Sequence, residues 1–198
     1  ERLICAGASC VKVGIGPSSI CTTRVVTGIG RPQLEAIMRC AKVARRHSIP
    51  ICADGGIDST GDIVKALAAG ASTVMMGSMF TGTEECPGPV ITASGKRYKL
   101  YRGMGSDSAM KERRSGSLYR YAGSEQYQPR AEGDERRVLL TGSVEPRIAE
   151  YADYTRKGLY YAGCRTIAEL HEKARFCVVT QAGVHESGVR DANKDIVV

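Results

Sequence analysis

The sequence predicts an α/β fold organised around a parallel sheet. Three short apolar segments are each followed by a glycine-containing loop and then by a segment with helical periodicity. Strands that alternate with helices at this spacing are typical of parallel sheets. A chain of 198 residues is long enough to bury a substantial core in one domain. We therefore expect an α/β domain whose functional residues gather at the carboxyl edge of the sheet.

Three strand-loop-helix units follow one another in the first part of the chain. The first has a strand at 10–13, a loop at 14–24 and a helix at 33–46. The second has a strand at 49–53, a turn at 54–57 and a helix at 60–69. The third has a strand at 73–76, the pair Gly77-Ser78 and a short helical stretch. Each strand ends near glycine and polar residues, so this edge of the sheet is where we expect the site.

The second half of the chain has fewer regular patterns. The turn at 93–96 predicts a small hairpin over 92–99, and helical periodicity returns at 146–157 and 166–173. An apolar segment at 176–180 predicts a further strand, and a polar tail follows over 181–198. Residues 104–136 are rich in Gly, Ser, Arg, Glu and Gln and show no period, which is typical of a mobile flap.

The beginning of the chain indicates a fold larger than this sequence. Residues 2–7 have the pattern of a helix end that leads into the first strand. Three parallel strands with their helices on one side cannot bury both faces of a sheet. We therefore expect the chain to form part of a larger barrel, with the earlier strands absent or supplied elsewhere.

Composition and charge argue against several classes of protein. The formal charge of +7 comes from basic residues interleaved with acids, and only 6% of the residues are aromatic. This balance disfavours nucleic-acid binding and favours an anionic small ligand. No apolar run is long enough to span a membrane, and no secretory signal peptide is visible. The eight cysteines are scattered without a CxxC pair, so we expect reduced thiols in a cytoplasmic protein without a structural metal.

Cys21 is the strongest candidate for a catalytic residue. It lies in the loop Gly14-Ile15-Gly16-Pro17-Ser18-Ser19-Ile20-Cys21-Thr22-Thr23-Arg24, which follows the first strand. A cysteine at a strand end, close to an arginine and a helix start, is placed where a thiolate can be stabilised. The alternative is a small buried apolar residue. The neighbouring glycines, serines and threonines favour the catalytic interpretation because they supply backbone donors and hydroxyls instead of packing.

Several motifs in consistent order resemble those of one known family. They are the cysteine loop, Ala53-Asp54-Gly55-Gly56-Ile57, Met76-Gly77-Ser78 and Tyr101-Arg102-Gly103-Met104-Gly105-Ser106. With these motifs the chain resembles the inosine-5′-monophosphate (IMP) dehydrogenase and GMP reductase family. The resemblance implies a TIM (β/α)8 barrel, of which residues 1–198 supply the last three βα units, the active-site flap (104–136) and the C-terminal segment (181–198). The N-terminal half of the barrel and any regulatory domain are not in this sequence.

The resemblance implies a purine nucleoside monophosphate as substrate. Backbone N–H groups at glycine turns can hold a phosphate after the last strands of such barrels. Asp54 would accept hydrogen bonds from the ribose, and Met104 and Gly105 would contact the base. The full set of expected substrate-binding residues is Ser19, Asp54, Gly55, Gly56, Gly77, Ser78, Tyr101, Gly103, Met104, Gly105 and Glu132. Taken singly, the glycines favour simple turn formation and Asp54 favours an acid in a helix turn, but three glycine-serine turns on one barrel face favour the phosphate site.

The resemblance also implies the chemistry of an oxidoreductase. Cys21 attacks C2 of the purine, hydride passes to NAD, and a covalent thioimidate remains to be hydrolysed. Arg120-Tyr121 in the flap matches the pair that activates water, and Thr23 and Glu132 match a supporting hydroxyl and carboxylate. The prediction is therefore NAD-dependent oxidation of IMP to XMP in guanine nucleotide biosynthesis.

Two alternative functions stay open. The first is a GMP reductase, which uses NADPH and the Cys21 thioimidate to deaminate GMP to IMP, with Thr23 and Glu132 assisting ammonia release. Tyr121-Ala122-Gly123 and Val179-Thr180-Gln181 are similar to reductases, whereas the long span 110–132 is similar to dehydrogenases. The second is a non-catalytic nucleotide sensor, against which the cysteine and the Arg120-Tyr121 pair argue.

Cofactor and subunit contacts also follow from the resemblance. NAD contacts are expected at Gly14, Gly16, Thr23 and Tyr161. A potassium ion is expected on carbonyl groups of Gly16, Ser18 and Cys21, completed by Glu186, Ser187 and Gly188 from an adjacent subunit. Such a shared site implies a homotetramer.

Overall fold

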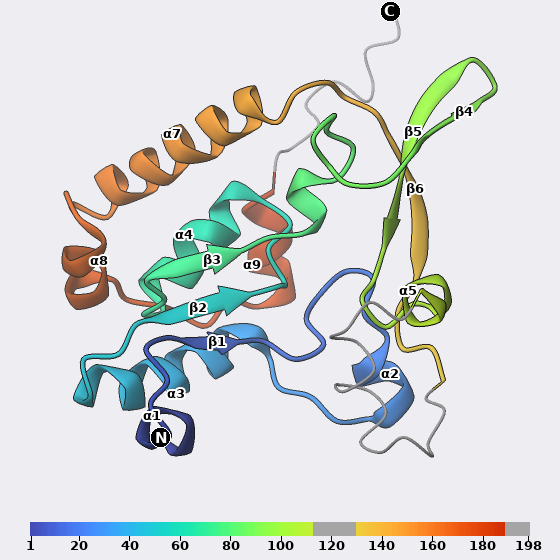
Figure 1. Cartoon of the computed structure of the whole chain (residues 1–198). Helices are drawn as coiled ribbons and strands as arrows, with labels where there is room; N and C mark the ends of the chain where they lie inside the picture. The colour runs from blue at the N-terminus through green and yellow to red at the C-terminus, as the bar shows by residue number, and fades with distance from the viewer. Residues whose placement is uncertain (113–129, 189–198) are drawn as a thin grey trace, which may run out of the picture.

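Two three-stranded sheets organise the computed structural model, which describes residues 1–112 and 130–188 (Figure 1). The first sheet is parallel and holds β1 (Val11–Val13), β2 (Ile51–Asp54) and β3 (Thr73–Met75) in that order. The second sheet is antiparallel and holds β4 (Val90–Ala93), β5 (Lys96–Arg102) and β6 (Glu135–Leu139). The predicted parallel strands and the predicted hairpin are confirmed, with small shifts at their ends.

Helices cover one face of the parallel sheet. The connections α3 (Gln33–Arg46) and α4 (Thr60–Ala68) join successive strands, as the sequence predicts. Two further helices, α7 (Glu145–Tyr161) and α8 (Ile167–Lys173), lie against α4 (Figure 1). The approach of α7 depends on Gly158, where a Cβ atom would lie 2.5 Å from the Val64 side chain. Apolar side chains of these helices and of the strands form the core.

The parallel sheet buries only one of its faces. Val13, Ile51 and Ala53 point into the core, whereas Lys12 and Met75 lie on the opposite face, where Met75 is 47% exposed. Successive side chains of a strand point to opposite faces, so this alternation follows directly from the sequence. Parallel sheets are normally covered on both faces. Within the described residues, the face that carries Lys12 and Met75 stays uncovered.

The shorter elements lie at strand ends and in the second half of the chain. They are α1 (Arg2–Cys5), α2 (Thr23–Thr27), the 3₁₀ turn η1 (Ser78–Phe80), α5 (Asp107–Lys111) and α9 (Gln181–Glu186). The prediction of an irregular stretch over 104–136 is wrong at both ends, because α5 and the start of β6 lie within it. Both are short and mostly polar, so they leave no periodicity. The centre of the predicted flap, 113–129, lies outside the described residues.

The predicted strand at 176–180 is wrong. These residues are irregular, and Val178 is fully exposed. Apolar, β-branched residues favour a strand only where a neighbouring strand can pair with them, and within the described part of the chain none pairs with this segment. The tail that follows begins with α9, in which Thr180 Oγ1 accepts a hydrogen bond from the Gly183 N–H at 3.2 Å. A cap of this kind explains a helix where only a polar tail was expected.

Candidate active site

The cysteine loop joins β1 to α2 at the carboxyl edge of the parallel sheet. Its end is a tight turn in which the Cys21 N–H donates to the Ser18 carbonyl at 3.0 Å. Ile20 is buried and anchors this turn, whereas Cys21 itself is only partly buried. The turn thus holds the thiol of Cys21 at the surface of the domain, where a ligand can reach it.

Three of the predicted catalytic residues form one hydrogen-bonded chain. The Cys21 thiol donates to Thr23 Oγ1 at 3.3 Å, and the Thr23 hydroxyl donates to Glu132 Oε2 at 2.7 Å. The two ends of the second bond are 109 residues apart in the sequence. A hydroxyl has one proton to donate, so its donation to the carboxylate leaves its oxygen free to accept from the thiol. The chain offers a route for a proton from sulfur towards the carboxylate.

The backbone fixes Glu132 next to the cysteine loop. Cys21 and Gly133 form an isolated antiparallel bridge, in which the Thr22 N–H donates to the Glu132 carbonyl at 3.0 Å. Gly133 also packs on the loop that ends at Ser106, because a Cβ atom at Gly133 would lie 2.9 Å from the Ser106 nitrogen. Glu132 is therefore positioned by main-chain contacts on both sides.

The predicted base-binding residues lie beside Glu132. The Glu132 N–H donates to the Gly105 carbonyl at 2.9 Å, and the Gly103 N–H donates to the Asp134 carbonyl at 3.0 Å. Met104, between the two glycines, is 56% exposed. The structure thus brings the 103–105 loop, Glu132 and the cysteine loop together.

The glycine turn after β2 packs directly on the cysteine loop. Gly55 and Gly56 have φ angles of +83° and +71°, a region that side chains other than glycine rarely adopt. A Cβ atom on either residue would lie 2.9 or 3.2 Å from the Pro17 ring. Both glycines are thus required by conformation and by close packing, and they place the turn under the loop that carries Cys21.

Tyr101 connects the turn after β3 to the same loop. A Cβ atom at Gly77 would lie 2.9 Å from the Tyr101 hydroxyl oxygen. Burial raises the pKa of the Tyr101 phenol, and a hydrogen bond with the Ser18 side chain offsets part of this effect. The phenol therefore stays protonated and can donate a hydrogen bond to an anion.

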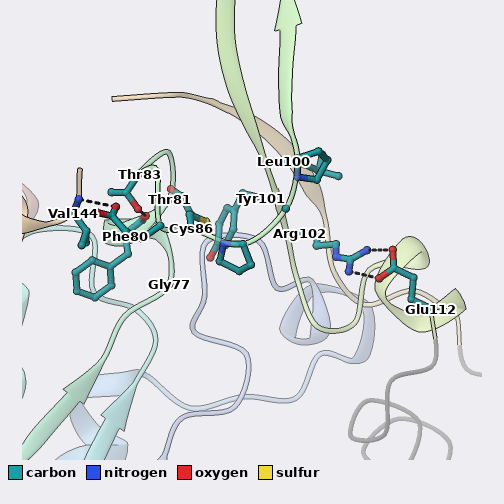
Figure 2. A pocket seen from close by; sticks show the side chains of 14 residues that line it. Gly77, Phe80, Thr81, Thr83, Cys86, Leu100, Tyr101, Arg102, Glu112 and Val144 are labelled. Carbon is teal, nitrogen blue, oxygen red and sulfur yellow. Dashed lines mark hydrogen bonds and ion pairs between the residues drawn. The ribbon is translucent and has the colours of Figure 1, made fainter. Parts of the chain in front are cut away.

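A cavity of about 830 Å³ adjoins this turn (Figure 2). Its walls come from the segment after β3 on one side and from β5 and α5 on the other, and include Gly77, Tyr101, Arg102 and Glu112. Cys21 does not line it. The candidate site is therefore the surface between Cys21 and Tyr101, and the cavity is its neighbour.

Two of the predicted substrate-binding side chains already have polar partners within the chain. The Lys12 ammonium pairs with the Asp54 carboxylate on the open face of the sheet. The Ser78 hydroxyl donates to Asp58 Oδ1 at 3.2 Å. The backbone carbonyl of Ser19 accepts from the Arg136 guanidinium at 3.4 Å. These contacts orient the side chains of Asp54 and Ser78 without burying them.

The structure does not bring all predicted site residues together. Tyr161 is exposed at the far end of α7, and Glu186, Ser187 and Gly188 lie at the end of α9 (Figure 1). Gly14 and Gly16 belong to the cysteine loop, where Cβ atoms would lie 1.9 Å from the Asp54 carbonyl oxygen and 2.8 Å from the Arg24 side chain. Arg120 and Tyr121 lie outside the described residues.

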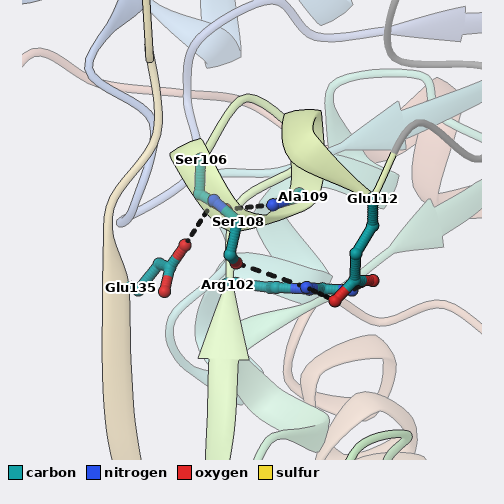
Figure 3. A network of polar contacts seen from close by, with 6 residues as sticks. All are labelled: Arg102, Ser106, Ser108, Ala109, Glu112 and Glu135. Carbon is teal, nitrogen blue, oxygen red and sulfur yellow. Dashed lines mark hydrogen bonds and ion pairs between the residues drawn. The ribbon is translucent and has the colours of Figure 1, made fainter.

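A polar network beside the 103–105 loop was not predicted from the sequence (Figure 3). The Arg102 guanidinium donates to Glu112 Oε1 at 2.8 Å and to Ser108 Oγ at 3.2 Å. Hydrogen bonds from Ser108 hold the pKa of Glu135 below its usual range. Ser106, which is fully buried, caps α5. The only signal in the sequence is that Arg102 and Ser106 flank the 103–105 motif.

Residues 1–112 and 130–188 contain neither a cluster of metal-binding side chains nor a helix that could span a membrane. This part of the chain contains no cluster of three or more His, Cys, Asp or Glu side chains able to hold a metal ion. None of its helices combines the length and apolar character needed to cross a membrane. All eight cysteines are free thiols.

Comparison with known proteins identifies the family. The family profile described as "IMP dehydrogenase / GMP reductase domain" matches residues 1–190. The chain belongs to this family. It is 53% identical over 191 residues to the inosine-5′-monophosphate dehydrogenase of Aquifex aeolicus, and the match covers 96% of this chain and 39% of that protein. The inosine-5′-monophosphate dehydrogenase of Chlorobaculum tepidum is 50% identical over 194 residues, with the same two shares covered.

A solved structure agrees with this assignment. The chain resembles a cysteine-to-alanine variant of GMP reductase from Trypanosoma brucei in complex with guanosine 5′-monophosphate, with 42% identity and a TM-score of 0.84. The match covers 94% of this chain and 37% of the reductase. The chain therefore spans well under half the length of the relatives that it matches. The predicted family and the α/β class are confirmed.

Proposed function

We propose that the protein is an NAD-dependent oxidoreductase that converts IMP to XMP in the cytoplasm, as a step of guanine nucleotide biosynthesis. The observation that carries the proposal is the hydrogen-bonded chain of Cys21, Thr23 and Glu132 beside three glycine turns. The names of the relatives that are about 50% identical support oxidation of IMP.

The chain would supply the last three βα units of a TIM barrel, with residues 104–136 as its flap and 181–198 as its C-terminal tail. The uncovered face of the parallel sheet supports this proposal, because that face carries Lys12 and Asp54 and would line a barrel interior. The preceding part of the polypeptide would cover it.

The nucleotide would lie across the carboxyl ends of the three strands. Its phosphate would accept hydrogen bonds from the glycine turns, together with Ser19, Ser78 and the phenol of Tyr101. Asp54 would accept from the ribose hydroxyls while Lys12 holds its carboxylate in place. The base would then lie between Cys21 and the 103–105 loop, next to Glu132.

The residues of this chain would carry the reaction as follows. Cys21 loses its thiol proton along the Thr23 hydroxyl towards Glu132, and its sulfur forms a bond to C2 of IMP. When bound, NAD accepts the hydride that leaves C2. The resulting thioimidate is cleaved by water, which gives XMP and restores the thiol. By resemblance, Arg120 and Tyr121 take the proton from that water.

Residues of this chain would supply contacts to the two expected cofactors, NAD and a potassium ion. The exposed apolar side chains of Ile15, in the cysteine loop, and Ile29, just after α2, would offer an apolar contact surface to the nicotinamide ring. The positive φ of +76° at Gly16 turns the chain sharply, so that carbonyl oxygens of the cysteine loop can converge on a potassium ion. Carbonyls at the end of α9, around Ser187, would complete that ion's shell from an adjacent subunit of a homotetramer. Tyr161 would contact the dinucleotide from elsewhere in such an assembly.

The second candidate function is NADPH-dependent deamination of GMP to IMP. It is favoured by the structural similarity to a GMP reductase. The direct hydrogen bond between Thr23 and Glu132 also favours it, because the pair could donate a proton to departing ammonia. In that reaction Cys21 forms the same thioimidate.

Two paired measurements on the full-length protein test the proposal. Turnover with IMP plus NAD is compared with turnover of GMP plus NADPH, and the nucleotide adduct is located by mass spectrometry. The adduct should map to Cys21 and be absent in Cys21→Ser; an adduct on another cysteine would refute the mechanism.

In a dehydrogenase, Arg120→Ala should preserve one burst of NADH and slow later turnovers. Unchanged turnover of IMP by Arg120→Ala, with loss of ammonia release in Glu132→Gln, would support the reductase.

A further inference from the structure

The side-chain amide of Gln33 joins the ends of two parallel strands. Gln33 is the first residue of α3, and its Nε2 donates to the Val13 carbonyl at 2.9 Å and to the Asp54 carbonyl at 3.1 Å. Val13 ends β1 and Asp54 ends β2. Both protons of one amide nitrogen are therefore used to hold the two strand ends together.

The two strands need this link because their own pairing stops there. The ladder between β1 and β2 ends at Val13 paired with Ala53, and the next residue of the first strand, Gly14, has a φ of +149°. A Cβ atom at Gly14 would lie 1.9 Å from the Asp54 carbonyl oxygen and 2.9 Å from Gln33 Nε2. Gln33 thus replaces the missing ladder bonds at the point where the cysteine loop leaves the sheet.

The other end of the same amide shows which of its atoms matter. Gln33 Oε1 is buried and has no hydrogen-bond partner among the residues that the structure describes. Leaving a buried acceptor without a donor is unfavourable. The amide therefore lies here for its two donor protons, which a carboxylate or an apolar side chain of the same size lacks.

We propose that Gln33 is a positioning residue, which sets the distance between the cysteine loop and the Asp54 turn and so aligns Cys21 with the bound nucleotide. The assignment rests on the proposed function, in which Cys21 attacks the base while the Asp54 turn holds the ribose and phosphate. Small errors in such alignment slow bond formation much more than they weaken binding.

Two substitutions separate the donors from the shape of the side chain. Gln33→Met keeps the length and removes both donors, and Gln33→Glu keeps the shape and places an acceptor against two carbonyl oxygens. The matched control is Lys42→Met, at an exposed position on the same helix. Three quantities are measured: the Kd of IMP by calorimetry, the rate of adduct formation per folded molecule, and the rate at which iodoacetamide alkylates Cys21.

Gln33→Met should slow adduct formation about tenfold or more and change the Kd of IMP by less than about threefold. Alkylation of Cys21 should change by at least about threefold, since the loop is no longer tied to β2. Lys42→Met should match the wild type in all three measurements. Wild-type adduct and alkylation rates in Gln33→Met would overturn the proposal, as would equal losses of binding and rate.

Gln33→Glu adds a pH profile that a purely structural role would not produce. Burial and two facing carbonyl oxygens should raise the pKa of the introduced carboxyl, and its protonated form regains one donor. The adduct rate relative to wild type should therefore rise as the pH is lowered from about 9 to about 6. The charged groups around this position are Lys12 and Asp54 across the sheet, and Asp62 and Lys65 in a cavity of about 260 Å³ that Gln33 lines. A flat ratio would count against the proposal.

The outcomes also separate this inference from the proposed function. If the wild type forms no adduct on Cys21 with either nucleotide, the proposed function fails. The alkylation rates still decide whether Gln33 holds the cysteine loop: a change in Gln33→Met but not in Lys42→Met supports the link to the loop, and no change refutes it.

Discussion

Removing the hydroxyl that links Cys21 to Glu132 should slow formation of the covalent adduct. In Thr23→Val the side chain keeps its shape but loses Oγ1, which lies 3.3 Å from the Cys21 sulfur and 2.7 Å from the Glu132 carboxylate. A short hydrogen bond to a charged group contributes about 1.5–3 kcal/mol. If that contribution is made as the thiol loses its proton, the rate should fall about 10- to 150-fold.

The assay is single-turnover adduct formation on the full-length protein, followed by intact-mass spectrometry and normalised to titrated Cys21 thiol. Thr23→Ser keeps the hydroxyl and should stay within about threefold of the wild-type rate, because both hydrogen bonds can still form. A wild-type rate in Thr23→Val would refute the reasoning. Equal slowing in Thr23→Ser and Thr23→Val would show that the effect does not depend on the hydroxyl, because Thr23→Ser retains it and Thr23→Val does not.

Two further predictions concern Tyr101, which contacts the cysteine loop, and Gly14, which begins that loop. Tyr101→Phe should weaken binding of IMP about 10- to 100-fold by calorimetry and leave binding of the phosphate-free nucleoside inosine unchanged, and an equal loss for inosine would contradict a phosphate contact. Because burial raises the pKa of this phenol, the affinity of the wild type for IMP should not fall between about pH 7 and about pH 9. Gly14→Ala should lower the free energy of unfolding by more than about 3 kcal/mol in urea denaturation, because the new Cβ would lie 1.9 Å from the Asp54 carbonyl oxygen. The control is Gly28→Ala, because Gly28 has a positive φ of +68° but open space around it, and this change should lower the free energy of unfolding by only about 1 kcal/mol. Equal losses of stability in the two variants would show that the backbone conformation, and not the close contact, causes the loss.

The part of the site that the sequence predicts best is the part made by strand ends. In a parallel sheet the carboxyl ends of neighbouring strands meet at one edge, so the cysteine loop, the Gly55-Gly56 turn and Gly77 had to lie close together. The structure agrees, since Pro17 touches Gly55 and the Tyr101 hydroxyl touches Gly77. The contact of Pro17 with Gly55 follows from topology, which local periodicity is enough to establish, whereas Tyr101 reaches Gly77 from the separate antiparallel sheet.

Contacts between distant segments could not be derived in this way. No spacing rule pairs Thr23 with a carboxylate 109 residues later, and only the family resemblance connected Thr23 with Glu132. The network of Arg102, Ser108 and Glu112 was missed because a single helical turn and a charged strand carry no apolar period. The wrong strand at 176–180 has the opposite cause, since its composition favours a strand but no partner strand is available in the described part of the fold.

The cysteine loop is held from three directions, and the supports differ in kind. Gln33 ties its start to β2, Tyr101 contacts Ser18 in its middle, and the bridge to Gly133 fixes its end. Each support comes from a different element, so losing one leaves the other two to keep the loop folded. Because the three supports hold the same loop, substitutions at two of them together should lower stability by more than the sum of the single effects, and Thr23 and Glu132, which share one hydrogen bond, must act as a unit. The proposed role of Cys21 as a nucleophile needs this arrangement, because a partly exposed loop without non-local contacts would sample many positions and would seldom align the sulfur with a bound base.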